Sequence, residues 1–141
     1  MQRKASAVWK GNLREGKGSI STDSGVLHDT QYSFHTRFED GKGTNPEELI
    51  AAAHAGCFTM ALSAELTKAQ LTADSLETTA AVTLEPVGGA PTVTKIHLTT
   101  RARVPGASKE QFATAANTAK TNCPISRLLQ AAAISLDAEL L

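Results

Sequence analysis

A long apolar segment near the middle of the chain constrains the fold more than any other feature. No Asp, Glu, Lys or Arg occurs between Leu49 and Ala64, and the apolar side chains go all the way round a helical wheel. A surface helix is apolar along one stripe only, so this helix must be covered on more than one side. A sheet of the same chain can cover one side, and the other side needs a second layer or a partner chain.

The start of this helix is marked by its capping residues. Asn45 is a favourable N-cap, Pro46 suits the first helical position, and Glu48 completes a capping-box pattern with Asn45. We expect the helix to begin at Pro46 and to continue to about Ala69. A polar, glycine-rich loop precedes it at Glu39–Asn45.

Alternation of apolar and polar residues predicts strands on both sides of the helix. Ala5–Trp9 alternates weakly, and Gln31–Phe38 alternates well. Two longer alternating runs, Leu76–Glu85 and Ile96–Val104, indicate a hairpin with one polar face, although Val93 falls out of phase.

The C-terminal part is expected to contain two helices and a last strand. A capping-box pattern at Ser108 and Gln111 opens a helix over 109–121, a short helix is expected over 125–131, and a strand over 134–140. This order of elements predicts an α+β fold with a mostly antiparallel sheet.

The composition favours one small domain without a strong charge. The chain has 141 residues, so we expect a single domain over residues 1–141. Lys+Arg and Asp+Glu number 14 each, which argues against binding of nucleic acid or anionic lipid through net charge. Aromatic residues make up 4%, so stacking platforms for single strands are not expected.

The N-terminus carries no signal-peptide pattern, and we expect no apolar run long enough to cross a bilayer. The expected location is therefore the cytoplasm, with no membrane partner. Two cysteines in that reducing compartment are not expected to form a permanent structural disulfide. Either they are small core residues or their thiol chemistry matters.

Cys57 lies about three turns inside the expected helix. The helix dipole acts within the first turn only, so a reactive Cys57 requires a nearby cation. Glu47, Ile50 and His54 lie along the helical face of Cys57. Arg37, at the end of the strand that precedes the helix, is the cation best placed by chain order; a solvated surface arginine is the alternative.

Cys123 directly precedes Pro124, at the expected start of the short helix. The dipole and the unpaired backbone N–H groups favour a thiolate there, whereas a weak helix cap is the alternative. His54, Cys57 and Cys123 give only three metal ligands and no CxxC pair, so we expect no metal. We also expect no cofactor, and His54 is expected to be a hydrogen-bonded histidine of the core or its rim.

Three segments carry recognisable motifs: "TNPEELIAAAHAGCF" at Thr44–Phe58, "NCPIS" at Asn122–Ser126 and "TRFE" at Thr36–Glu39. Together they resemble the OsmC/Ohr family of peroxide reductases, and within it the osmotically inducible branch. The resemblance covers nearly the whole chain. It implies an α+β fold that forms an intertwined homodimer, with two central helices packed together.

The resemblance also implies roles for four residues. Family members are thiol peroxidases, and the peroxidatic role falls on Cys57 and the resolving role on Cys123. An arginine–glutamate pair falls on Arg37 and Glu47. Arg14 is the alternative arginine, because the two branches place theirs at different points in the chain, and the "TRFE" motif favours Arg37.

The reaction implied is the reduction of organic hydroperoxides, and of hydrogen peroxide as a further candidate, in oxidative and osmotic stress defence. A sulfenic acid on Cys57 is resolved by Cys123 as a disulfide, which an external dithiol, of lipoyl type by resemblance, reduces. Apolar residues of the central helix are expected to bind the hydrocarbon part of the substrate, namely Ile50, Ala53, Phe58 and Met60.

Two other functions stay open at this point. One is a non-enzymatic, dimeric stress protein or small-ligand binding protein whose cysteines are merely buried. The other is a dithiol oxidoreductase that acts on proteins, which the absence of a CxxC motif disfavours.

Overall fold

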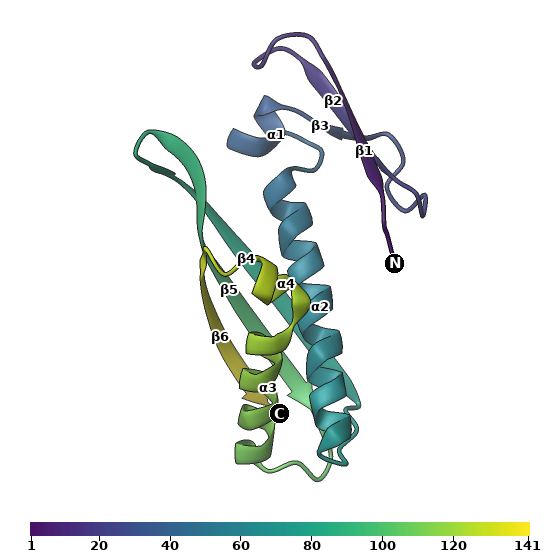
Figure 1. Cartoon of the computed structure of the whole chain (residues 1–141), viewed down its shortest axis with the longest axis vertical. Coiled ribbons are helices and arrows are strands. Elements are labelled where there is room, and N and C mark those ends of the chain that lie inside the picture. Colours follow the sequence, from purple (N-terminus) through teal and green to yellow (C-terminus); the bar gives the residue numbers. More distant parts are fainter. The chain divides into compact units, whose positions relative to one another are not determined.

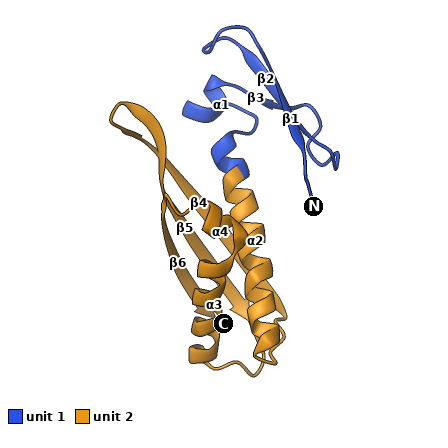
Figure 2. Cartoon of the chain, in the orientation of Figure 1, with its two compact units in different colours: residues 1–49 blue, residues 50–141 orange.

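The computed structural model describes residues 1–141 and divides into two units, residues 1–49 and residues 50–141 (Figure 2). Helix α2 (Pro46–Lys68) begins in the first unit and continues through the second. The prediction of a single domain over the whole chain stays a prediction, because a division by packing does not decide whether the units fold separately.

The first unit contains a three-stranded antiparallel sheet (Figure 1). Its strands are β1 (Ala5–Lys10), β2 (Lys17–Thr22) and β3 (Thr30–Tyr32), in that order across the sheet. The predicted strand at Ala5–Trp9 is confirmed. The short helix α1 (Phe34–Phe38) follows β3 directly.

The predicted strand over Gln31–Phe38 is wrong beyond Tyr32. Ser33 is instead the N-cap of α1: its Oγ accepts from the Thr36 N–H at 3.2 Å, and the Ser33 N–H donates to Thr36 Oγ1 at 2.8 Å. These reciprocal bonds satisfy backbone donors of the first turn, so local capping overrides the alternating pattern. Arg37 therefore lies on a helix rather than on the polar face of a strand.

Helix α2 starts at the predicted residue and ends at Lys68, one residue before the predicted end. Asn45 Oδ1 accepts from the Glu48 N–H at 2.8 Å, which confirms the N-cap. The Glu48 carboxylate accepts from Thr44 Oγ1 at 2.7 Å, so this pair replaces the second half of the predicted capping box.

Helix α2 is also long enough and apolar enough to cross a membrane, with 23 residues and a mean hydropathy of 1.4 over its most apolar window. The expectation that no segment reaches this length is therefore wrong. Length and composition alone decide nothing further, because the core helix of a globular protein meets the same criterion.

The second unit contains the strands β4 (Ser75–Val87), β5 (Ala90–Arg103) and β6 (Ala133–Leu140), in that order across the sheet. β4 and β5 form the predicted antiparallel hairpin, and β6 runs parallel to β5. The register shifts at one point, where Thr83 pairs with Lys95 but Leu84 pairs with Val93. This bulge explains why Val93 falls out of phase.

Helices α3 (Lys109–Asn122) and α4 (Pro124–Leu128) connect β5 to β6. The capping box at Ser108 and Gln111 is confirmed, and the short helix ends at Leu128 rather than at the predicted residue 131. Figure 1 shows α3 and the C-terminal part of α2 on one face of the β4–β5–β6 sheet.

The core of the second unit lies between this sheet face and the two helices. Its buried members include Phe58, Leu62 and Leu66 of α2, Leu98 and Ala102 of β5, and Phe112, Ala115, Ala116 and Ala119 of α3. Only one stripe of α2 is buried within the chain, and Met60 is 77% exposed. Cover of the opposite side by a second chain stays a prediction.

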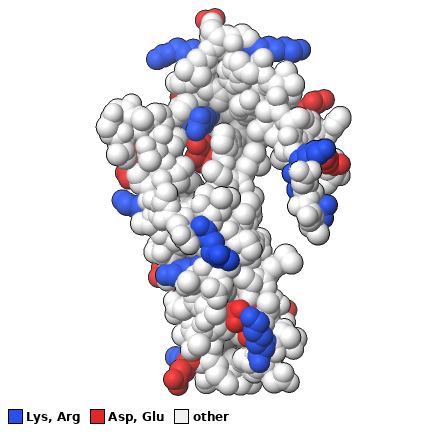
Figure 3. All heavy atoms as spheres, viewed as in Figure 1, with Lys and Arg blue, Asp and Glu red and all other residues white.

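Charged side chains are dispersed over the face of the molecule drawn in Figure 3. Figure 3 shows Lys and Arg interspersed with Asp and Glu on the face in view, without a large patch of one sign. This distribution matches the zero net charge of the sequence.

Ser33→Ala is expected to lower the free energy of unfolding by about 1 kcal/mol, because it removes the N-cap acceptor of α1. Urea denaturation measures the change. Ser33→Thr keeps the hydroxyl and should retain most of the stability, and Ser6→Ala on the exposed strand β1 is the matched control. Equal stability of Ser33→Ala and Ser6→Ala would show that the cap does not stabilise the unit.

Candidate active site

The two cysteines of the chain lie together in the second unit although 66 residues separate them. Their Sγ atoms are 2.6 Å apart, roughly half an ångström more than a disulfide bond, and both are free thiols. Cys57 is partly exposed, whereas Cys123 is fully buried. A redox reaction between these sulfur atoms therefore needs almost no movement of the backbone.

The break between α3 and α4 holds Cys123 in this position. Cys123 is both the C-cap of α3 and the N-cap of α4, and its N–H donates to Ala119 O at 2.9 Å. Pro124, which has no N–H, starts α4 at its first position. The Cys123 side chain makes no capping hydrogen bond to α4. Its sulfur contacts Cys57.

Burial and two neighbouring groups set the acidity of Cys57. Burial raises the pKa of this thiol, and the hydrogen bond that it shares with Cys123 raises its pKa further. The backbone N–H of Ile125, in the first turn of α4, acts in the opposite direction. The net pKa lies above the ordinary thiol value, so Cys57 is mainly protonated at neutral pH.

A second polar pair joins α2 to α4. His54 Nε2 and Ser126 Oγ are 2.7 Å apart, and both residues are buried. This confirms the expected hydrogen-bonded core histidine. Burial lowers the pKa of His54, so its ring is neutral near pH 7. No protein atom pairs with His54 Nδ1, and such a buried unpaired group costs about 1–3 kcal/mol.

Metal ligands do not gather around these residues. His, Cys, Asp and Glu side chains form no group of three or more that could hold a metal ion. The ring nitrogen of His54 that has a partner faces Ser126 rather than either sulfur.

Arg37 and Glu47 form a bidentate ion pair in the first unit. Arg37 Nη2 and Nε donate to Glu47 Oε1 at 2.7 and 3.1 Å, and Nε lies 3.2 Å from Oε2. The Glu47 side chain is only 12% exposed, whereas that of Arg37 is 38% exposed. The alternative arginine, Arg14, instead lies over the ring of Phe34 at 5.5 Å. The structure therefore pairs Glu47 with the arginine that the sequence favours.

An apolar pocket of about 280 Å³ adjoins Arg37 within the first unit. Trp9 and Tyr32 lie 5.5 Å apart, above Gly18, where any larger residue would meet their rings. The residues that line the pocket are Trp9, Leu13, Tyr32, Ser33, Phe34, Arg37, Phe38 and Pro46.

Sequence reasoning missed this pocket, although a signal was available. Four of the six aromatic residues, counted from one Trp, one Tyr and four Phe, occur within the first 38 positions. Aromatic residues so concentrated in one short region of an aromatic-poor chain indicate a shared surface or core.

The four predicted substrate-binding residues do not share one environment. Phe58 is fully buried in the core of the second unit, while Met60 is 77% exposed. Ile50 is partly buried and Ala53 is exposed. Their role in binding stays a prediction.

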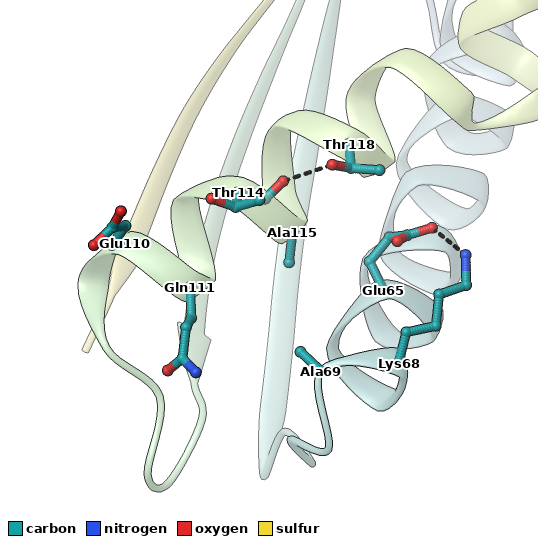
Figure 4. A pocket seen from close by; sticks show the side chains of 8 residues that line it. All are labelled: Glu65, Lys68, Ala69, Glu110, Gln111, Thr114, Ala115 and Thr118. Carbon is teal, nitrogen blue, oxygen red and sulfur yellow. Dashed lines mark hydrogen bonds and ion pairs between the residues drawn. The ribbon is translucent and has the colours of Figure 1, made fainter.

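The surface groove between α2 and α3, about 420 Å³ in volume, contains neither cysteine (Figure 4). Two of its polar contacts join residues of the same helix: Lys68 Nζ lies 2.7 Å from Glu65 Oε1, and Thr118 Oγ1 donates to Thr114 O at 2.8 Å. We assign it no part in the thiol chemistry.

Comparison with solved structures identifies the fold. The OsmC-like protein from Mycoplasma pneumoniae superimposes with a TM-score of 0.78 at 16% identity, over 100% of this chain and 98% of that one. The organic hydroperoxide resistance protein OhrB of Bacillus subtilis superimposes with a TM-score of 0.68 at 26% identity, over 98% of each chain. The predicted OsmC-like α+β fold is confirmed.

Sequence comparison gives the same answer with a higher identity. The chain is 48% identical over 140 residues to the protein named Peroxiredoxin OsmC of Escherichia coli (strain K12), across 99% of this chain and 97% of that protein. Residues 39–139 match the family described as OsmC-like protein. Since this match spans most of the sequence and agrees with the fold, the chain belongs to the OsmC-like protein family.

Proposed function

We infer that the protein is a thiol peroxidase that reduces organic hydroperoxides to alcohols. The observation that carries this conclusion is the 2.6 Å separation of the Cys57 and Cys123 sulfur atoms, in a chain 48% identical to a protein named Peroxiredoxin OsmC. Solved relatives named as organic hydroperoxide resistance proteins support an organic peroxide as the substrate. A small-ligand binding protein would not need two free thiols in contact.

Cys57 is the proposed nucleophile, because it is the more exposed of the two cysteines. Its thiolate attacks the distal oxygen of ROOH, the O–O bond breaks, and RO⁻ leaves and takes up a proton as ROH. The resulting sulfenic acid on Cys57 is attacked by Cys123, which forms a disulfide and releases water. An external dithiol then reduces the disulfide by exchange.

Arg37 is proposed to stabilise the negative charge that develops on the departing alkoxide. A low thiol pKa alone gives little, because nucleophilicity falls nearly as fast as the thiolate fraction rises. A fixed donor in a dry site can contribute about 3–4 kcal/mol to the transition state. Glu47 would hold the guanidinium in place through the bidentate pair.

The aromatic pocket beside Arg37 favours a substrate with a hydrocarbon tail. Its lining is mainly apolar, and its volume of about 280 Å³ accommodates a small organic group. Ile50, Ala53, Phe58 and Met60 of α2 remain candidates for further contacts with the substrate.

The proposed oligomeric state and reductant follow from the family resemblance and from the exposed side of α2. We propose a cytoplasmic homodimer of single-domain chains, in which a second copy covers the exposed side of α2 that carries Met60. The thiol reductant is proposed to be a lipoyl-type dithiol. Hydrogen peroxide is a candidate second substrate in oxidative and osmotic stress defence.

Cys57→Ser is expected to abolish peroxide turnover, and Cys123→Ser to allow one reduction per chain and then accumulate a sulfenic acid on Cys57. Thiol counting and mass spectrometry after a stoichiometric addition of cumene hydroperoxide measure both outcomes. The unmodified protein should lose two thiols per peroxide. Full turnover by Cys57→Ser would assign the nucleophile elsewhere, and no loss of thiols in the unmodified protein would favour the binding-protein alternative.

Arg37→Lys is expected to reduce kcat/KM for an organic hydroperoxide by about 10²–10³-fold, because lysine cannot reproduce the bidentate geometry. Steady-state kinetics measure the effect, and circular dichroism confirms the fold. Arg14→Lys is the matched control and should stay near the unmodified rate. The reverse pattern would transfer the role to Arg14.

The rate of Cys57 oxidation is expected to rise with pH beyond the ordinary thiol range, because burial and Cys123 raise the pKa of Cys57 and the thiolate is the nucleophile. Cys123→Ala removes both the hydrogen bond and the charge interaction with Cys123 that raise this pKa, so the midpoint should move to lower pH. Single-turnover rates across pH test both statements. An identical midpoint in the variant would show that Cys123 does not influence the acidity of Cys57.

A further inference from the structure

Two side-chain contacts, rather than one, join α2 to α4 and its N-cap residue. Cys57 contacts Cys123 at 2.6 Å, and His54 contacts Ser126 at 2.7 Å. His54 precedes Cys57 by three residues, and Ser126 follows Cys123 by three residues, so the contacts are one helical turn apart on both helices. The contact between His54 and Ser126 therefore lies beside the thiol contact and parallel to it, one helical turn away.

Helix α4 depends on Ser126 for its attachment. It has five residues, too few for a helix that is stable by itself, and Ser126 is its only buried residue. Leu128, the apolar residue at its end, is 75% exposed. The polar bond of Ser126, together with the half-buried side chain of Ile125, therefore anchors the segment that follows Cys123.

Packing alone does not account for the histidine at this position. His54 is completely buried, yet one of its two ring nitrogens has no partner in the protein. A buried polar atom without a partner weakens the folded state, and an apolar residue of similar size would avoid that cost. The bond through the other nitrogen offsets part of that cost and joins α2 to α4 at Ser126.

We propose that His54 and Ser126 are positioning residues for the resolving step, holding Cys123 within reach of the oxidised Cys57. This proposal rests on the peroxidase function inferred above. In the step concerned, the Cys123 sulfur forms an S–S bond to Cys57, the S–O bond of the sulfenic acid breaks, and the hydroxyl leaves with the thiol proton as water. Cys57 is reduced and Cys123 is oxidised.

Loss of the bond between His54 and Ser126 would prolong the lifetime of the sulfenic acid without slowing its formation. A second hydroperoxide molecule can then oxidise it to a sulfinic acid, releasing a second alcohol. The ratio of disulfide to sulfinic acid thus indicates whether Cys123 is held close to Cys57. A role limited to fold stability would not change this ratio in the folded protein.

The test compares Ser126→Ala and His54→Leu with the unmodified protein at increasing cumene hydroperoxide. Stopped-flow mixing follows sulfenic acid formation, and mass spectrometry measures the ratio of disulfide to sulfinic acid. We expect formation of the sulfenic acid to stay within twofold, and disulfide formation to slow by about ten- to a hundredfold. His54→Gln, which keeps a hydrogen-bonding group near the Nε2 position, should restore most of the rate.

Ser135→Ala provides the matched control. His97 Nδ1 and Ser135 Oγ also lie 2.6 Å apart, but this pair is on strands β5 and β6. Its loss should leave the disulfide yield unchanged. The double variant His54→Leu with Ser126→Ala removes both polar partners, so it should stay folded while resolution remains slow.

Two outcomes would overturn the inference. One is an unchanged rate of disulfide formation in both single variants, and the other is equal slowing by Ser135→Ala. If the unmodified protein forms neither sulfenic acid nor disulfide with hydroperoxide, the peroxidase function itself fails. A failure of the positioning role alone is thus distinguishable from a failure of the proposed function.

Discussion

The contact between the Cys57 and Cys123 sulfur atoms is the constraint on which the arrangement of the second unit depends. It requires the middle of α2 to lie against the segment that carries the chain from β5 to the parallel strand β6. A parallel pair needs such a long crossover connection, and here the crossover is broken into two helices at Pro124. The break places the Cys123 sulfur against that of Cys57.

The electrostatics of this contact favour a resting state of low reactivity. Burial and the neighbouring thiol raise the pKa of Cys57, while one backbone N–H from α4 partly opposes them. A protonated thiol reacts slowly with most electrophiles, because the thiolate is the nucleophile. The selectivity for peroxides then has to come from groups that act on the transition state, such as the ion-paired Arg37 in the proposed mechanism.

Most of the fold was predictable because its signals are local. Capping residues mark the starts of α2 and α3, and alternation marks the β4–β5 hairpin and β6. The strand predicted through Arg37 failed for an equally local reason: Ser33 and Thr36 satisfy the backbone of a helical turn that alternation cannot reveal. The pattern of apolar residues was weaker evidence there than two reciprocal hydrogen bonds.

The candidate site was only partly predictable. Motif likeness predicts roles for Cys57, Cys123, Arg37 and Glu47, but no rule of spacing brings residues 57 and 123 together. Their contact depends on how a crossover packs on a helix, which is a tertiary property. The bond between His54 and Ser126 is of the same kind. A histidine in an apolar helix predicts a hydrogen-bond partner but does not identify that residue.

The 66-residue separation of the two cysteines has a thermodynamic consequence. A covalent bond between them would close a long loop and reduce the entropy of the unfolded chain, which corresponds to roughly 4 kcal/mol in the chain-entropy model. The oxidised protein would then be the more stable form. The gain in the free energy of unfolding would equal a large share of a domain's net stability. Each reduction by the external dithiol would return the chain to its less stable state, so the catalytic cycle and the folding equilibrium share one bond.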